Sequence, residues 1–321
     1  MDKSVNNNYK LLLDIAELYY NGNYTQSEIA QRFSISRPKV SRSLAEAREQ
    51  GIVKIFIDNK VESVNSIENH IMDRFNLHAV KVVSVPDYDP VLSMQITAQA
   101  AANFIVDFFE QGDDIGISWG LTIYSLAKYF PDICLDETRF FQITGSLDST
   151  TIRSRAGEII NIFSQKFNTN SVYTMPCPVM LDNKIIVDIL LHDSKIKKLY
   201  EMTCNCNKLI INLAPATKDC CLFMANYIDE NDLINLNQKG AQGSICNRFI
   251  DINGNICDPA LNDRTFGIPL SKIKGKEKVI SIVSSIKKVP VLLAALNSNL
   301  INVLVIDSVS ADYLLNLDIN N

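Results

Sequence analysis

The residues best suited to chemistry lie in the stretch GISWGLT (116–122), whose pattern predicts a strand that turns into a helix. Gly116 and Gly120 allow another group to approach the backbone closely. Ser118 and Thr122 add hydroxyls, and the first N–H groups of a helix carry a partial positive charge. These features are typical of a phosphate-binding turn. A turn that serves only packing is the alternative.

Acid–base groups show no comparable arrangement. The histidines, His70, His78 and His192, are isolated from one another. General acid–base catalysis needs a positioned group of suitable pKa. No pair stands out by spacing among Asp107, Asp113, Asp114, Asp193, Asp251 and Asp307. No catalytic residue is therefore predicted.

The cysteines indicate neither a metal site nor a disulfide framework. The eight are Cys134, Cys177, Cys204, Cys206, Cys220, Cys221, Cys246 and Cys257. Structural zinc usually takes CxxC spacing, often with histidine, and the CNC and CC pairs here have neither. Free cysteine often serves as a small core residue. We expect reduced, buried or inert thiols, no metal and no other cofactor.

Two short helices are predicted in the first sixty residues. Thr25, followed by Glu28, forms a capping box that begins a helix in YTQSEIAQRF. Ser36 and Pro38 mark the start of the next helix, in SRPKVSRSLAEAREQG, after a tight turn around Ile35. The run IVKIFI (52–57) then alternates like a short strand.

The second of these helices carries a cationic face. Val40, Leu44 and Ala47 recur at helical spacing and must face inward, which leaves Arg37, Lys39, Ser41, Arg42 and Ser43 outward. Arg and Lys neutralise DNA phosphates, and the first turns of a recognition helix reach base edges. The pattern predicts a helix-turn-helix that contacts DNA through Thr25, Gln26, Ser36, Arg37, Lys39, Ser41 and Arg42. A generic three-helix bundle with a basic surface is the alternative.

The GISWGLT turn must be positioned by the elements around it. From residue 79 onward, short β-rich runs alternate with helical segments; the runs are AVKVVSV, DIGISW, FFQITG, VYTMPCPVML, KLIINLA, GIPL, KVISIVSS and NVLVIDS. Such alternation predicts a largely parallel sheet covered on both faces. Ligands bind such sheets where strands exit into helices, as at this turn. The segment 61–77 predicts a linker helix that either pairs with a partner subunit or docks on the body.

Length and charge indicate two domains and a polyanionic partner. At 321 residues the chain is long for one domain. Residues 1–60 carry nine Lys/Arg and seven Asp/Glu, whereas the whole chain has a formal net charge of −5. No apolar run reaches the length of about 18 residues that a membrane span needs. The N-terminus also lacks signal-peptide features, so we expect a cytoplasmic protein with no membrane partner.

The N-terminal stretch YYNGNYTQSEIAQRFSISRPKVSRSLAEAREQGIVKIFI resembles the DNA-binding head of the SorC family of bacterial transcriptional regulators. That family reads as tyrosines and a glycine, then TQ.EIA, then SR..VSR.L..A...GIV. The resemblance implies a regulator that binds double-stranded operator DNA as a homo-oligomer, a dimer or tetramer.

The body resembles the same family nearly to its end. GISWGLT is similar to its G.(S/T)WG.T element, GAQGSICNRFIDINGNI to GAVGDI..RF.D..G, and INVLVIDSVSADYLL to I.VLITD...A..LL. The resemblance implies an α/β protein: an N-terminal helix-turn-helix domain plus a Rossmann-like effector domain related to sugar-phosphate isomerases. It also implies a phosphorylated sugar effector, contacted by Ser118, Trp119, Gly120, Thr122, Thr144, Ser244, Lys288 and Asp307.

Two departures from the family pattern keep alternatives open. Ser244 stands where the family has an acidic residue, and Ser284-Ser285 replaces a glycine pair. The first hypothesis is a regulator that responds to a phosphorylated sugar. The alternatives are a sugar-phosphate isomerase or deaminase and a regulator whose body serves only oligomerisation. The expected domains are a DNA-binding domain at 1–58, a linker helix at 59–78, and an effector and oligomerisation domain at 79–321.

Overall fold

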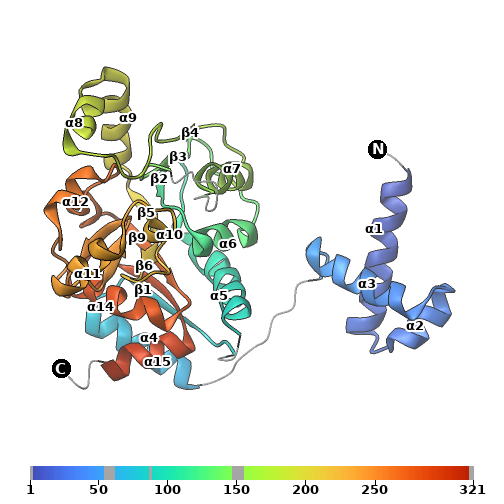
Figure 1. Cartoon of the computed structure of the whole chain (residues 1–321). Coiled ribbons are helices and arrows are strands. Elements are labelled where there is room, and N and C mark those ends of the chain that lie inside the picture. Colours follow the sequence, from blue (N-terminus) through green and yellow to red (C-terminus); the bar gives the residue numbers. More distant parts are fainter. Residues whose placement is uncertain (1–2, 54–61, 87–88, 147–154, 318–321) are drawn as a thin grey trace. The chain divides into compact units, whose positions relative to one another are not determined.

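The computed structural model describes residues 3–53, 62–86, 89–146 and 155–317. Contacts divide the chain into two compact units, Met1–Lys60 and Val61–Asn321, which we call the head and the body (Figure 1). The expected boundary at residue 58 and most of the expected strand at 52–57 lie outside the described residues.

Between residues 3 and 53 the head contains three helices and a π turn. They are α1 (Lys3–Ala16), the π turn η1 (Glu17–Asn21), α2 (Gln26–Phe33) and α3 (Arg37–Glu49). Ile15, Ile29, Val40 and Leu44 share one apolar core between them. The predicted capping box is confirmed, because the Thr25 hydroxyl accepts from Glu28 N at 3.3 Å and the Glu28 carboxylate accepts from Thr25 N at 2.8 Å.

Two details of α3 differ from the sequence prediction. Ser36 is the N-cap residue, but its side chain makes no capping hydrogen bond. The outward position predicted for Ser43 is wrong, since this residue is only 6% exposed. Ser43 lies three residues after Val40 and four before Ala47, so helical spacing places it on the same buried face.

The body alternates strands and helices along the chain. Its strands are β1 (Ala79–Val83), β2 (Asp114–Ile117), β3 (Arg139–Gln142), β4 (Val172–Tyr173), β5 (Lys208–Ile211), β6 (Leu213–Ala214), β7 (Gly243–Ile245), β8 (Arg248–Ile250), β9 (Lys278–Val283) and β10 (Val303–Asp307). Its helices are α4 (Glu62–Phe75), α5 (Pro90–Ile105), α6 (Leu121–Tyr129), α7 (Ala156–Lys166), α8 (Lys184–His192), α9 (Ser194–Cys204), α10 (Cys221–Met224), α11 (Glu230–Gln238), α12 (Pro259–Arg264), α13 (Leu270–Ile273), α14 (Val289–Asn297) and α15 (Ser308–Leu317), with 3₁₀ turns η2 (Val106–Phe108) and η3 (Ile286–Lys288).

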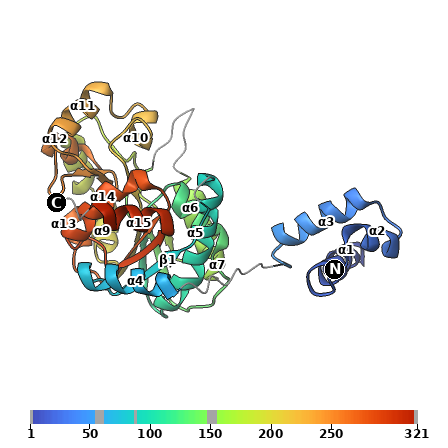
Figure 2. The same cartoon turned by 90° about the horizontal axis from the view of Figure 1, so that it is seen from below.

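A seven-stranded parallel sheet with two covered faces organises the body, as the sequence predicts. Its strand order is β1-β10-β9-β5-β2-β3-β4. Alternate residues of β10 enter two separate apolar clusters: Val305 packs in the cluster with α5, α6 and α7, and Leu304 in the cluster with α4, α14 and α15. Figures 1 and 2 show these helices on opposite sides of the sheet.

The direction in which the chain adds strands reverses between β2 and β5. From β2 the chain continues to β3 and β4 on one side, then returns to β5 on the other side and continues to β9 and β10. Loops leaving neighbouring strands at such a reversal diverge and leave a crevice at the carboxyl ends, where ligands bind open α/β sheets. The GISWGLT turn follows β2, so it lies at this switch point.

Three expected strands are shorter or absent. VYTMPCPVML keeps only Val172–Tyr173 as a strand and GIPL forms no strand, because prolines remove the N–H donors that a ladder needs. KLIINLA is divided at Asn212 into β5 and β6, which belong to different sheets. The segment expected as a linker helix contains α4, which packs on the body through the fully buried Ile71.

Candidate functional site

The turn after β2 opens the N-terminus of α6. Gly120 is the N-cap residue, with φ +145°, and no side chain caps the helix. Its carbonyl accepts from Tyr124 N at 2.8 Å, so the helix begins regularly. The preceding N–H groups of the first turn have no acceptor within the helix. They give the start of α6 a partial positive charge.

Lys288 lies beside this helix end. Its ammonium donates to Thr122 Oγ1 at 3.1 Å and to Asn212 Oδ1 at 3.2 Å. The three residues come from the start of α6, the end of β5 and the segment after β9. We call Gly120, Thr122, Asn212 and Lys288 the switch-point site. The tertiary fold therefore joins Gly120, Thr122 and Lys288, which the sequence assigned to the effector.

The charge of the switch-point site is positive and unbalanced. Among the described residues, no carboxylate forms an ion pair with Lys288. Burial lowers the pKa of Lys288 to about 8, because desolvation disfavours the charged ammonium. An anion at this place would gain a cation, a hydroxyl and open helix N–H groups.

Ser118 and Trp119 hold the turn from the inside. Ser118 N donates to Ile210 O at 2.9 Å, which extends the pairing of β2 with β5 beyond the strand. Trp119 is 3% exposed, and its indole Nε1 donates to Gly145 O at 2.8 Å. The indole therefore fixes the turn against the segment after β3.

Three further effector candidates lie elsewhere in the body, two of them at strand ends and one inside the short strand β7. Thr144, after β3, is fully buried beside Gly267, and its hydroxyl has no hydrogen-bond partner among the described residues. Ser244 is buried in β7, opposite Ala214 and Phe249. Asp307 ends β10; its carboxylate accepts from Ser310 N at 2.6 Å and Ser310 Oγ at 2.9 Å, so it caps α15. Burial raises the pKa of Asp307.

Asn212 is the site residue that the sequence analysis missed. Its signal was a single polar residue directly after the buried run KLII, at the carboxyl end of a strand. A Cβ built on Gly120 would lie 2.7 Å from Asn212 Nδ2 and 3.0 Å from Asn212 Cγ. The Asn212 side chain therefore lies directly against Gly120.

Arg248 lies in the GAQGSICNRFIDINGNI motif and holds a later segment of the chain. Its buried guanidinium donates to the carbonyls of Asn262, Thr265, Gly267 and Ile268 at 2.8–3.0 Å and to Asn262 Oδ1 at 2.6 Å. Burial lowers the pKa of this arginine. Arg248 thus fixes the LNDRTFGI loop on β8 and serves as an internal support.

The part of the chain that the structure describes contains no set of metal ligands. No group of three or more His, Cys, Asp or Glu side chains there could hold an ion. All eight cysteines are free thiols. Burial raises the pKa of Cys246 to about 12, so that thiol stays protonated at neutral pH.

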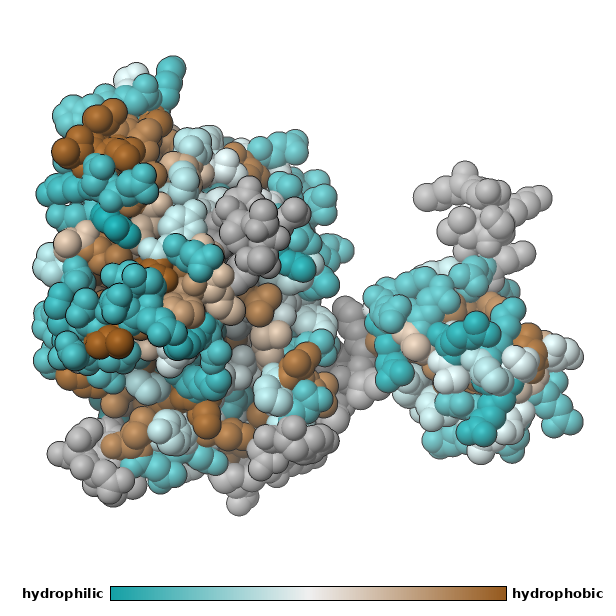
Figure 3. All heavy atoms as spheres, in the orientation of Figure 1, coloured by the Kyte–Doolittle hydropathy of each residue, from teal (hydrophilic) through white to brown (hydrophobic). Residues whose placement is uncertain are grey.

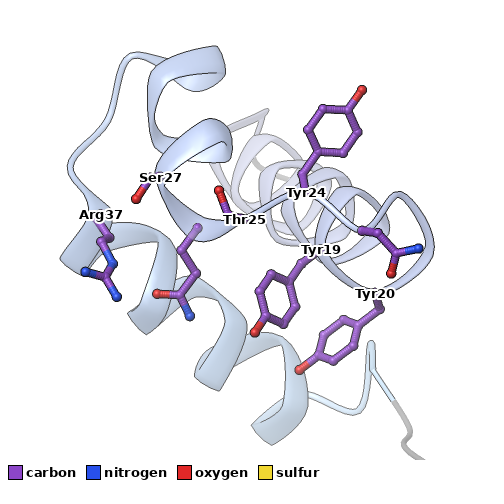
Figure 4. Close-up of a pocket in the computed structure, with 8 residues that line it drawn as sticks. Tyr19, Tyr20, Tyr24, Thr25, Ser27 and Arg37 are labelled. Atoms are coloured by element: carbon purple, nitrogen blue, oxygen red, sulfur yellow. The ribbon is translucent and has the colours of Figure 1, made fainter.

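The head has a pocket at the start of α2. Its volume is about 580 Å³, and it is lined by Tyr19, Tyr20, Asn23, Tyr24, Thr25, Gln26, Ser27 and Arg37. Figure 4 shows the Thr25, Ser27 and Arg37 side chains near the beginnings of α2 and α3, with Tyr19 and Tyr20 extending from η1. Hydroxyls and a guanidinium around a helix start are groups that bind phosphate oxygens.

The cationic side chains of α3 are open to solvent. Arg37, Lys39, Ser41 and Arg42 are all exposed, and in the described ranges no carboxylate pairs with the three cations. Arg42 Nε donates only weakly within its own helix, to Pro38 O at 3.4 Å. Their charge is therefore available to a polyanion.

A three-helix head whose third helix carries exposed cations, together with an α/β body that has a lysine without a carboxylate partner among the described residues at its topological switch point, is typical of a ligand-responsive DNA-binding protein. Residues 59–316 match a family described as "Putative sugar-binding domain", and residues 15–54 match "Winged helix-turn-helix DNA-binding". The chain belongs to the SorC/DeoR family of sugar-binding transcriptional regulators. It is a regulator of transcription and not an enzyme.

Relatives of known name match along almost the whole chain. The deoxyribonucleoside regulator of Bacillus subtilis is 31% identical over 96% of this chain and 97% of its own. The sorbitol operon regulator of Klebsiella pneumoniae is 28% identical over 95% and 98%. The full-length crystal structure of that sorbitol regulator covers 98% of this chain and 99% of its own, with a TM-score of 0.75 and 27% identity. A DeoR family regulator from Listeria monocytogenes shares the fold, with a TM-score of 0.72 and 22% identity over 79% of this chain and all of its own.

Within the described ranges, no helix is both long enough and apolar enough to cross a bilayer.

Proposed function

We propose that this regulator binds a phosphorylated sugar at the switch-point site, and that binding changes the affinity of the head for operator DNA. The observation that carries the proposal is Lys288, a cation without a carboxylate partner among the described residues, held by Thr122 at the open start of α6. A phosphate monoester matches these donors in charge and in number of acceptor oxygens. The relatives named for deoxyribonucleoside, sorbitol and erythritol support genes of carbohydrate metabolism as targets.

The remaining effector residues complete this proposal. We assign the phosphate to Ser118, Trp119, Gly120, Thr122 and Lys288, with the first two acting through the shape of the turn. We assign the sugar to Thr144, Ser244 and Asp307. The unpartnered hydroxyl of Thr144 supports this choice. Asp307 would use the lone pairs that its helix cap leaves free.

The head is proposed to contact operator DNA through Thr25, Gln26, Ser36, Arg37, Lys39, Ser41 and Arg42. Twofold-symmetric operators are read by twofold-symmetric proteins, so we propose a cytoplasmic homo-oligomer, a dimer or tetramer. Exposed Ile185 and Ile189, one turn apart on α8, give the body an apolar patch that supports self-association (Figure 3). The proposed domains are a helix-turn-helix DNA-binding domain at 1–58, a linker helix at 59–78 and an effector and oligomerisation domain at 79–321.

Coupling between the two sites would operate by linkage. A ligand shifts an equilibrium only by the difference in its affinity for the two states. An effector that prefers one subunit arrangement would therefore change DNA affinity, and bound DNA would change effector affinity by the same factor.

The test is a thermal-shift screen of pentose, hexose and polyol phosphates, with each unphosphorylated parent as its control. A ligand at about 100 times its Kd stabilises the folded state by about 2.7 kcal/mol. We expect phosphorylated compounds to raise the melting temperature and their parents not to do so. Each hit is then added to a titration with a duplex selected from a random library, where we expect a changed Kd.

If none of these compounds raises the melting temperature, the protein does not sense a phosphorylated sugar. That result would favour a regulator whose body serves only oligomerisation. A hit that stabilises the body without changing the Kd for DNA would refute the coupling alone.

A further inference from the structure

Asn212 holds Lys288 without cancelling its charge. Asn212 Oδ1 accepts from the ammonium at 3.2 Å, and Thr122 Oγ1 accepts at 3.1 Å. Both acceptors are neutral. A carboxylate at either place would orient the ammonium equally well but would leave no net charge to attract an anion.

The other half of the Asn212 carboxamide faces the start of α6. With Oδ1 directed at Lys288, Nδ2 lies toward Gly120, 2.7 Å from the position of a Cβ on that residue. No hydrogen bond of Nδ2 occurs among the described residues, and the side chain is half-buried. Nδ2 therefore adds a donor beside Gly120 at the start of α6.

Gly120 is required for this arrangement. Its φ of +145° disfavours any L side chain, and a Cβ there would collide with Asn212. Glycine thus lets the amide of one strand end lie directly on the helix start that follows the neighbouring strand. The pairing of Ile117 with Ile210 in the β2–β5 ladder sets this register.

We propose that Asn212 is a specificity-determining residue of the effector site: its Nδ2 donates to an oxygen of the ligand's anionic group while its Oδ1 positions Lys288. The inference rests on the proposed function. It defines the ligand class by chemistry, as a group with several acceptor oxygens and net negative charge, such as a phosphate monoester. A neutral hydroxyl group would gain much less from the same donors.

The test compares full-length wild type with Asn212→Ala and Asn212→Asp. The probes are inorganic phosphate and the best sugar phosphate of the screen, with its unphosphorylated parent. Losing one hydrogen bond to a charged group costs about tenfold in affinity, which we expect for Asn212→Ala. We expect at least about a hundredfold loss for Asn212→Asp, because its carboxylate would neutralise Lys288 and repel the ligand.

The matched control is Asn235→Asp, the same change at an exposed position of α11. It should bind phosphate ligands as wild type does. If Asn212→Asp lowers the melting temperature too far for binding assays, Asn212→Ala decides.

Two results would overturn the role of Asn212 while leaving the proposed function intact. One is a sugar-phosphate affinity of Asn212→Asp within about threefold of wild type, against the hundredfold expected from charge neutralisation. The other is a sugar-phosphate affinity of Asn212→Ala within about threefold of wild type, against the tenfold loss expected from the missing hydrogen bond. A wild type that binds neither phosphate nor any sugar phosphate would overturn both.

Discussion

Lys288 is an amine placed where its protonated form is costly. Burial lowers its pKa to about 8 from the ordinary 10.5. Between these two values the unfolded chain binds more protons than the folded one, so this lysine makes stability rise with pH there. Below pH 8 the buried ammonium is charged, and it lowers the free energy of unfolding by its full amount. Affinity for an anionic ligand should instead fall as the pH rises, because an anion binds the protonated ammonium.

We therefore expect sugar-phosphate affinity to weaken by up to about tenfold per pH unit above the Lys288 pKa of about 8. Below that pH a phosphate monoester is mostly dianionic down to a pKa of about 6, so affinity should be greatest between these values. Calorimetric titration from pH 6.5 to 9.5 measures the profile. Lys288→Arg, which stays charged throughout, should flatten the decline. A wild-type Kd that is constant from pH 7 to 9.5 would exclude Lys288 as the phosphate partner.

At the scale of elements, the β2–α6 turn depends on a conformation that few residues adopt. Gly120 has φ +145° and ψ 166°, a region essentially confined to glycine. The same glycine accommodates the Asn212 side chain. The backbone conformation and the contact with Asn212 therefore both oppose a side chain at this position.

Gly120→Ala should destabilise the body by about 3 kcal/mol or more, because backbone strain of about 1–3 kcal/mol adds to a collision with Asn212. Gly112→Ala is the matched control: Gly112 also has positive φ, +82°, but nothing lies within 4 Å of its Cβ position. It should cost about 1–2 kcal/mol. Urea unfolding measures both. Equal losses would mean that the Asn212 contact is unimportant.

At the scale of the whole molecule, charge is divided between the two units. The head has more Lys and Arg than Asp and Glu, while the chain as a whole carries −5. The acidic body should repel DNA, so we expect affinity for DNA to come from the exposed cations of α3.

We expect operator affinity to fall linearly with log salt, since bound cations release counterions from DNA. Arg42→Ala or Lys39→Ala should each reduce the magnitude of that slope by about 1. Lys197→Ala, which removes an exposed lysine of α9 in the body, is the charge-matched control and should leave the slope unchanged. Fluorescence anisotropy from 50 to 300 mM salt measures it. A slope that Arg42→Ala and Lys39→Ala leave unchanged would exclude α3 as the DNA-contacting helix.

Local patterns predicted much of both units. Thr25 and Glu28 are three residues apart, so their capping box follows from sequence alone. The apolar strand runs predicted a parallel sheet covered on both faces, because a strand buried on both sides needs no polar alternation. The placement of Ser43 failed because the inward face of α3 is wider than the three apolar residues used to define it.

The sequence by itself therefore determined the helix-turn-helix, its cationic face, the class of the body and the glycine turn after β2. Only the tertiary structure decided what faces that turn. Asn212 and Lys288 lie about ninety and about one hundred and seventy residues beyond Gly120, and they reach it because β5 pairs with β2 and β9 with β5. Such pairings depend on long-range packing and strand order, which no local spacing encodes. The same long-range order placed Trp119 against Gly145, where its indole supports the turn from inside.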